Sequence, residues 1–332
     1  MGRLLISGFR GTRPGDAEVD EVRRMLEAGL CGGVILLRRN CISPEQMSRL
    51  SAAFKDAAGD LTPVISVDQE GGEVARLDNQ NGFLDWRSAA EMALLDQPDD
   101  EVLDYWKRRA QQLTAVGINL NFAPVVDLNL NPSNPIIGKL GRSFGSDPDK
   151  VTRLAGLFIR AHRLAGVKTS LKHFPGHGSS TSDSHLESAD VSAAWKPEEL
   201  KPFQELVRNG LADSVMNAHL LHPNFSDAPM VPASLSRRSV DAIRAILGFD
   251  GAIFTDDMQM AAVENAKPFD AAAIAAVNAG NTFLIYSNYR KSDGIDTVER
   301  ALEALQGNTA FLDLVAIAAQ IASADAFRRE LS

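Results

Sequence analysis

Short apolar runs alternate with segments of helical period along most of this 332-residue chain. Between the runs, apolar residues recur at helical spacing, as in Val22, Met25 and Leu26. This alternation is typical of βα units around a parallel sheet. It predicts eight strands, at residues 4–7, 34–37, 64–67, 118–122, 168–171, 214–217, 252–255 and 282–286.

The clearest helical face is formed by Val151, Leu154 and Phe158, which precede Gly166, a residue suited to end a helix. Residues 311–321 predict another helix close to the carboxyl terminus. Eight strands that alternate with such helices favour a closed barrel over a doubly wound sheet, which would have fewer strands and usually a Gly-rich phosphate-binding turn. No G-x-G-x-x-G sequence occurs.

We therefore expect an α/β fold, a TIM-type (β/α)8 barrel that forms a single domain over residues 1–332. No linker, charge block or low-complexity run interrupts the chain. The two longest connections, residues 77–100 and 128–149, are expected to be insertions at the active site.

The charge balance limits the possible partners. With 34 basic and 43 acidic residues the net charge is −9, the wrong sign for a surface that follows nucleic-acid phosphates. The apolar stretches are shorter than the ~20 residues of a membrane span. Cys31 and Cys41 are too few for a disulfide framework, so we expect reduced packing residues.

The amino terminus lacks the apolar core of a secretory signal, which predicts a cytoplasmic protein. A periplasmic or secreted protein whose signal was trimmed would have the same sequence, so that alternative stays open. The oligomeric state is not encoded in any pattern that we recognise, and a monomer is compatible with the sequence.

Polar and charged side chains follow the predicted strands. Active sites of barrels are assembled at the carboxyl ends of their strands, so these residues predict a polar site rich in carboxylates. The residues at the strand ends are Arg38, Asp68, Asp127, Lys172 with His173, His219, Asp256 with Asp257, and Asn288.

Three of these positions lie in segments whose residues could take part in catalysis or substrate binding. Residues 172–178 (KHFPGHG) form an irregular loop, and Asp183 and His185 follow it, two residues apart. A carboxylate beside an imidazole favours a proton donor that works near neutral pH. Asp68 precedes a Gly-Gly turn and is suited to accept hydroxyl hydrogen bonds, and Asp256 at a strand end is well placed as a nucleophile.

Five motifs, in order, resemble glycoside hydrolase family 3, specifically its single-barrel bacterial β-N-acetylglucosaminidases (β-N-acetylhexosaminidases) of peptidoglycan recycling. They are residues 68–76 (DQEGGEVAR), 121–127 (NFAPVVD), 141–145 (GRSFG), 172–185 (KHFPGHGSSTSDSH) and 255–258 (TDDM). The resemblance implies a barrel without the second sandwich domain of many relatives, no cofactor and no bound metal. After His185 the sequence LESAD departs from the recycling enzymes, which leaves the leaving-group specificity open.

By this resemblance, Asp256 corresponds to the nucleophile of a retaining mechanism, and Asp183 with His185 to an Asp-His pair that replaces a carboxylic acid/base. The Asp-Ser-His element implies N-acetylhexosamine substrates, such as peptidoglycan fragments, rather than glucosides. His177 lies in the signature loop without an implied role. The residues implied to hold the sugar are Asp68, Arg76, Arg142, Lys172 and His173.

Four other interpretations remain open at the level of sequence. His173, His177, Asp183 and His185 are metal-ligand types, so a metallohydrolase is one. The others are a β-glycosidase of different specificity, a phosphorolytic β-N-acetylglucosaminidase and a non-catalytic sugar-binding barrel. A histidine in place of an anionic acid/base would repel phosphate less, which is why phosphorolysis is considered.

Overall fold

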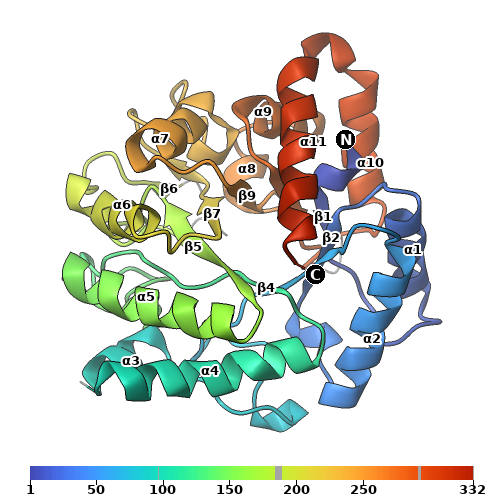
Figure 1. Ribbon diagram of the computed structural model, residues 1–332. Coiled ribbons are helices and arrows are strands. Elements are labelled where there is room, and N and C mark those ends of the chain that lie inside the picture. The colour runs from blue at the N-terminus through green and yellow to red at the C-terminus, as the bar shows by residue number, and fades with distance from the viewer. Residues whose placement is uncertain (96, 184–188, 291–292, 332) are drawn as a thin grey trace.

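A computed structural model describes residues 1–95, 97–183, 189–290 and 293–331. Within these residues, eight parallel strands close into a barrel in the order β1-β10-β9-β7-β5-β4-β3-β2, which confirms the predicted TIM-type fold (Figure 1). The strands are β1 (Leu5–Ser7), β2 (Gly33–Leu36), β3 (Val64–Val67), β4 (Leu120–Asn121), β5 (Lys168–Phe174), β7 (Ser214–Asn217), β9 (Ala252–Asp257) and β10 (Phe283–Tyr286).

Helices surround the barrel because each strand is followed by at least one helix that packs its apolar face on the sheet (Figure 1). The predicted apolar face of Val22, Met25 and Leu26 is buried in this way. The helices are α1 (Ala17–Glu27), α2 (Pro44–Ala57), α3 (Ala89–Leu94), α4 (Asp99–Ala115), α5 (Pro148–Leu164), α6 (Lys201–Arg208), α7 (Arg237–Leu247), α8 (Ala261–Glu264), α9 (Phe269–Ala279), α10 (Thr297–Gly307) and α11 (Leu314–Arg329).

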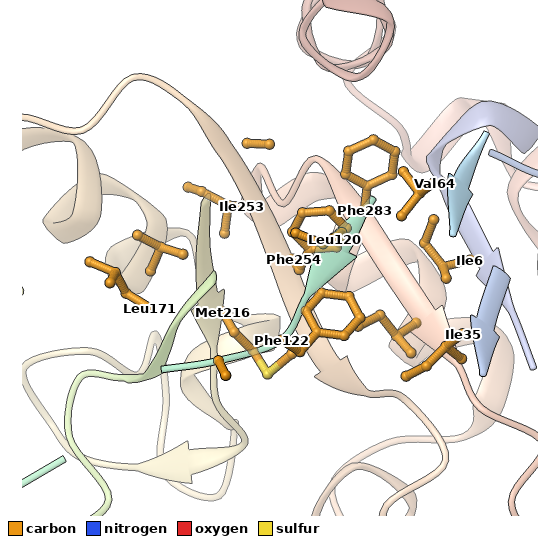
Figure 2. Packing of buried hydrophobic residues seen from close by; sticks show 14 of the residues in the cluster. Ile6, Ile35, Val64, Leu120, Phe122, Leu171, Met216, Ile253, Phe254 and Phe283 are labelled. Carbon is orange, nitrogen blue, oxygen red and sulfur yellow. The ribbon is translucent and has the colours of Figure 1, made fainter. Parts of the chain in front are cut away.

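Aromatic rings fill the interior of the barrel, as Figure 2 shows. The Phe254 ring stacks on Phe283 at 4.6 Å between centroids and meets Phe122 edge-on at 5.2 Å. Aliphatic side chains from the other strands, such as Ile6 and Val64, complete the packing. The barrel is therefore a packed core and not a pore, so a ligand can bind only at an end of it.

Helix α11 covers the end of the barrel where the strands begin. Its Phe327 ring lies 5.7 Å from that of Phe254, and Arg328 donates hydrogen bonds to the carbonyls of Leu61 and Thr62, which precede β3. The opposite end, where the strands finish, carries the loops and remains available for a site.

The terminal helix differs from the prediction at both ends. It runs from Leu314 to Arg329, whereas the prediction was 311–321. Asp313 sets the start, because its carboxylate accepts a hydrogen bond from the amide of Ala316 and caps the helix. Phe311, expected inside this helix, belongs to a preceding 3-10 turn and is largely exposed.

Two smaller expectations are confirmed. Cys31 and Cys41 are buried free thiols. Helix α5 ends at Leu164, and Gly166 adopts a left-handed φ of 78° just beyond it, as its proposed capping role requires. Among the described residues, no helix is both long and apolar enough to cross a membrane.

Candidate active site

A cavity of about 850 Å³ opens where the strands end. Seven of the eight residues predicted for the site line it, and the eighth, His185, lies outside the described residues. The cavity therefore brings together side chains from strand ends and loops that are far apart in the sequence. The seven lining residues are Asp68, Arg76, Arg142, Lys172, His173, Asp183 and Asp256.

Ion pairs organise the side of the cavity formed by the ends of β3 and β5. Lys172 Nζ lies 2.9 Å from Asp68 Oδ1, and Arg76 approaches the other oxygen of Asp68 at 3.4 Å. Burial by itself would raise the pKa of Asp68, but Lys172 and Arg76 outweigh it and hold the pKa below its ordinary value. Asp68 is thus a charged acceptor at neutral pH.

Glu70 is the centre of the same network, and the sequence analysis gave it no role. Both of its oxygens accept from the Arg142 guanidinium at 2.8 Å, and Lys172 Nζ lies 2.6 Å away. Burial opposes ionisation of Glu70, yet the two cations lower its pKa far below the usual range. Glu70 therefore fixes the positions of two predicted sugar-binding cations. We refer to Asp68, Glu70, Arg142 and Lys172 as the paired cluster.

Asp127 lies beneath the cavity and not at its rim, where the strand-end pattern had placed it. It is fully buried, and its carboxylate lies 2.7 Å from His173 Nδ1 and accepts a hydrogen bond from the amide of His177 at 2.8 Å. The other ring nitrogen of His173 is 3.2 Å from Arg142. Both nitrogens of His173 thus have protein partners, which argues against the metal-ligand interpretation of this residue.

The opposite side of the cavity carries two adjacent carboxylates at the end of β9. Asp256 lines the cavity, and its Oδ1 accepts a hydrogen bond from the amide of Asp257 at 2.8 Å. Asp257 accepts from the amides of Gln259 and Ser287, each at 3.1 Å, and from the Ser287 hydroxyl. Asp257 thereby ties the end of β9 to the end of β10. We refer to Asp256, Asp257, Gln259 and Ser287 as the β9 carboxylate site.

Burial raises the pKa of Asp257 to about 6, although the hydrogen bonds from Ser287 act in the opposite direction. A carboxyl that titrates so close to neutrality, next to a proposed nucleophile, is typical of functional sites. Its partners are amides and a hydroxyl, in contrast to the cations around Glu70.

Two other strand-end residues support the site from below, which corrects their expected place on its rim. His219 is buried, and its Nε2 lies 2.9 Å from the carbonyl of Asp257. Asn288 is also buried; it donates to the carbonyl of Gly8 at 2.7 Å, and its amide donates to Gln259 at 2.8 Å. His219 braces the backbone of Asp257, and Asn288 joins the Gln259 side chain to the backbone at Gly8.

The two long connections contribute differently. Residues 128–149 line the cavity through Ile136, Leu140 and Arg142, as predicted for an active-site insertion. Residues 77–100, as far as they are described, pack beside the cavity without lining it, so the same prediction was wrong for them. Their contact with the site is indirect, because Asp78 pairs with Arg38 on the cavity wall.

Comparison with known proteins agrees with the geometry. Residues 5–319 match the model of the glycosyl hydrolase family 3 N-terminal domain. A beta-hexosaminidase of Tolumonas auensis is 38% identical over 81% of this chain and 79% of its own, and one of Pseudomonas aeruginosa is 38% identical over 86% and 82%.

The solved structure of a glycoside hydrolase family 3 beta-N-acetylglucosaminidase from Paenibacillus sp. str. FPU-7 has a TM-score of 0.89 and 32% identity, and it covers 99% of this chain. The present chain spans 61% of that protein. The family match over nearly the whole barrel, together with the two 38% identical relatives, is decisive. The chain belongs to glycosyl hydrolase family 3.

Proposed function

We propose that this protein hydrolyses terminal β-linked N-acetylglucosamine, or a related N-acetylhexosamine, from glycosides with retention of configuration, and that its substrates are peptidoglycan fragments. The observation that carries the proposal is that Asp256 and Asp183 line one cavity together with the paired cluster. A retaining glycosidase needs a nucleophilic carboxylate, a proton donor and fixed polar groups that bind sugar hydroxyls. Asp256 supplies the first, Asp183 belongs to the proposed proton-donating pair, and the paired cluster supplies the polar groups.

In the proposed first step, an Asp256 oxygen attacks the anomeric carbon while the bond to the leaving-group oxygen breaks. His185 donates its proton to that oxygen, and Asp183 orients the imidazole and favours its protonated form. In the second step His185 removes a proton from water, which attacks the anomeric carbon and releases Asp256. The sugar leaves with its original configuration.

The paired cluster, with Arg76 and His173, is proposed to hold the sugar in the subsite of the bond that is cleaved. Lys172 and Arg142 line the cavity, and Asp68 and Glu70 already hold them in place, so they need no further ordering when a sugar binds. Asp68 is charged and accepts hydroxyl hydrogen bonds. Binding energy is therefore not spent on arranging these side chains when the sugar enters.

The proposal for the sugar rests on the printed names of the relatives, beta-hexosaminidase and beta-N-acetylglucosaminidase, and on the Asp-Ser-His element of residues 183–185. The proposal of an anionic aglycone, as in peptidoglycan fragments, is supported by three arginines on the cavity wall of a chain with a net charge of −9. Arg38 is paired with Asp78 and Arg290 with Glu264. Arg39 donates to backbone carbonyls, such as that of Ser287 at 3.1 Å, and is the arginine best placed to meet an anionic group. An anionic group at this wall would meet local positive charge.

A panel of p-nitrophenyl β-glycosides tests the sugar. The N-acetylglucosaminide should be turned over much faster than the glucoside or the xyloside, and faster turnover of either would overturn the specificity. Product analysis with and without inorganic phosphate separates the two reaction types, since a sugar phosphate as the main product would show phosphorolysis. A disaccharide with an anionic muramyl aglycone should be preferred over chitobiose if the arginines act as proposed.

A further inference from the structure

The segment that leads from β5 to Asp183 is held from below by a buried carboxylate without a role in the mechanism above. This carboxylate belongs to Glu199, in the 3-10 helix η4 (Pro197–Leu200). Its side chain is completely buried, and one oxygen accepts a hydrogen bond from the amide of Gly178 at 3.2 Å. The other oxygen accepts from the amide of Lys196 at 3.3 Å. Glu199 thus joins the loop to the start of α6.

The loop backbone packs directly on Glu199. A Cβ atom added at Gly176 would lie 2.7 Å from the Cβ of Glu199, and Gly176 has a φ of 123° that other residues rarely adopt. A Cβ at Gly178 would lie 1.6 Å from the carbonyl oxygen of Leu128. The absence of a side chain at both glycines therefore lets the loop backbone pack closely, at Gly176 against the Glu199 side chain and at Gly178 against the Leu128 carbonyl.

Further hydrogen bonds restrain the same segment. Asp127 accepts from the amide of His177, while Asn134 donates to the carbonyl of His177 at 2.7 Å. Asn131 donates to the carbonyl of Ser180 at 2.8 Å. Beyond these contacts the chain reaches Asp183 on the cavity wall. The placement of Asp183 therefore depends on a short segment whose only carboxylate supports among these contacts are Asp127 and Glu199.

Glu199 differs from Asp127 in its charge environment. Burial raises the pKa of Glu199 to about 7, and the negative charge of Asp127 acts in the same direction. Asp127 has the opposite tendency, since His173 and His177 lower its pKa against the effect of burial. No cation among the described residues pairs with Glu199, so its burial is costly, and its hydrogen bonds with backbone amides offset part of that cost.

We propose that Glu199 is a positioning residue, whose carboxylate holds residues 176–183 so that Asp183 stands at the cavity in the orientation needed for proton transfer. This inference rests on the proposed function of Asp183 and His185. Glu199 does not line the cavity that holds Asp256 and the paired cluster, so its loss should impair protonation of the leaving group and leave nucleophilic attack and sugar binding in place.

The test compares kcat/KM for two N-acetylglucosaminides, one with 2,4-dinitrophenol as leaving group and one with a poor leaving group such as methanol. Dinitrophenolate departs without protonation, whereas methanol requires it. At pH 8, where most of Glu199 is ionised, Glu199→Gln should lower kcat/KM at least tenfold on the methyl glycoside and less than threefold on the dinitrophenyl glycoside. Glu198→Gln is the matched control, because this neighbour is exposed and the charge change is the same. It should alter neither value.

Equal losses on both substrates, or no loss on either, would overturn the positioning role. If Glu199→Gln does not fold, Glu199→Asp takes its place, since it keeps the charge but is too short to reach Gly178. Asp183→Asn is measured in parallel. If it also lacks leaving-group dependence, the proposed acid/base pair has failed; if it shows that dependence and the Glu199 variants do not, only the inference about Glu199 has failed.

Discussion

The two sides of the cavity surround their carboxylates with different partners. In the paired cluster, Glu70 lies between Arg142 and Lys172, and its pKa is far below the ordinary range. In the β9 carboxylate site, Asp257 is held by amides and by the Ser287 hydroxyl, and its pKa is raised to about 6. On the first side, cations in direct contact compensate the charge of Glu70, whereas the hydrogen bonds described for Asp257 come from amides and a hydroxyl.

This difference matches the two tasks of a glycosidase. Groups that hold hydroxyls benefit from fixed charges, because preorganised donors and acceptors do not reorganise during the reaction. A carboxylate that acts as a nucleophile is better oriented by hydrogen bonds than by a cation in direct contact, because the cation would stabilise its charge and reduce its tendency to attack. We therefore expect binding and stability to depend on the first side, and chemistry on the second.

The largest effect is expected at the nucleophile. Asp256→Ala removes the oxygen that forms the glycosyl intermediate, so kcat/KM on an activated aryl N-acetylglucosaminide should fall more than about a thousandfold. Thermal unfolding should show an unchanged fold. If the variant keeps a tenth of the wild-type kcat/KM, the assignment to Asp256 is wrong and Asp257 becomes the candidate.

Breaking the paired cluster should affect stability most. Glu70→Gln removes the carboxylate paired with the buried Arg142 and leaves Lys172 paired with Asp68, so it should lower the free energy of unfolding by about 3–5 kcal/mol in urea titrations. Asp104→Asn, which breaks the exposed pair with Arg108, is the control and should change it much less. Similar losses in the two variants would contradict the role given to Glu70.

A smaller effect is expected from Asp183→Asn, which keeps the side-chain shape and removes the charge that favours imidazolium. The maximum of the pH profile of kcat/KM should fall about tenfold, and its basic limb should move to lower pH because that limb reports the essential acid. If Asp183 merely braced the loop, the basic limb would stay in place and chiefly KM would rise.

The smallest predicted effect concerns Ser287→Ala. Because folding raises the pKa of Asp257 to about 6, the wild type loses stability as the pH rises from about 4 to 6. Without the Ser287 hydroxyl that pKa rises further, so the loss continues at higher pH. The stability gap to wild type should be small at pH 4 and reach about 1–2 kcal/mol at pH 8.

A matched serine variant controls for the loss of a buried hydroxyl. Ser214→Ala removes a hydroxyl that donates to the carbonyl of Thr169 at 2.9 Å, with no carboxylate involved. Its stability gap to wild type should not depend on pH. A gap for Ser287→Ala that is equally constant from pH 4 to 8 would refute the link to Asp257.

The strands could be predicted because strands of a parallel barrel are short and buried, so they are apolar runs of four to six residues that recur between helices. Their ends could not, because pairing depends on neighbouring strands. β4 pairs only at Leu120 and Asn121, since Ala123 and Pro124 follow. β5 instead continues to Phe174, which pairs with Asn217 on β7.

The strand-end pattern correctly placed Asp68 and Asp256 at the cavity, but it did not separate them from Asp127, which is buried beneath it. Glu70 was missed because nothing in its own motif, residues 68–76, distinguishes it. Its two cations follow much later in the chain, Arg142 on a loop 72 residues on and Lys172 on β5 102 residues on. Glu199 follows Glu198 at the start of a helix and looks like a surface acid. Only the folded chain brings it under Gly178.

The central claim is that the nucleophile lies at the end of β9, and its most direct test identifies the residue that becomes glycosylated. The Asp183→Asn variant is mixed with the 2,4-dinitrophenyl N-acetylglucosaminide, so that the glycosyl intermediate forms quickly and its hydrolysis is slow. Acid quenching, proteolysis and tandem mass spectrometry then locate the adduct. We predict one N-acetylhexosaminyl group on Asp256. An adduct on Asp257, or on a residue of the paired cluster, would contradict the account.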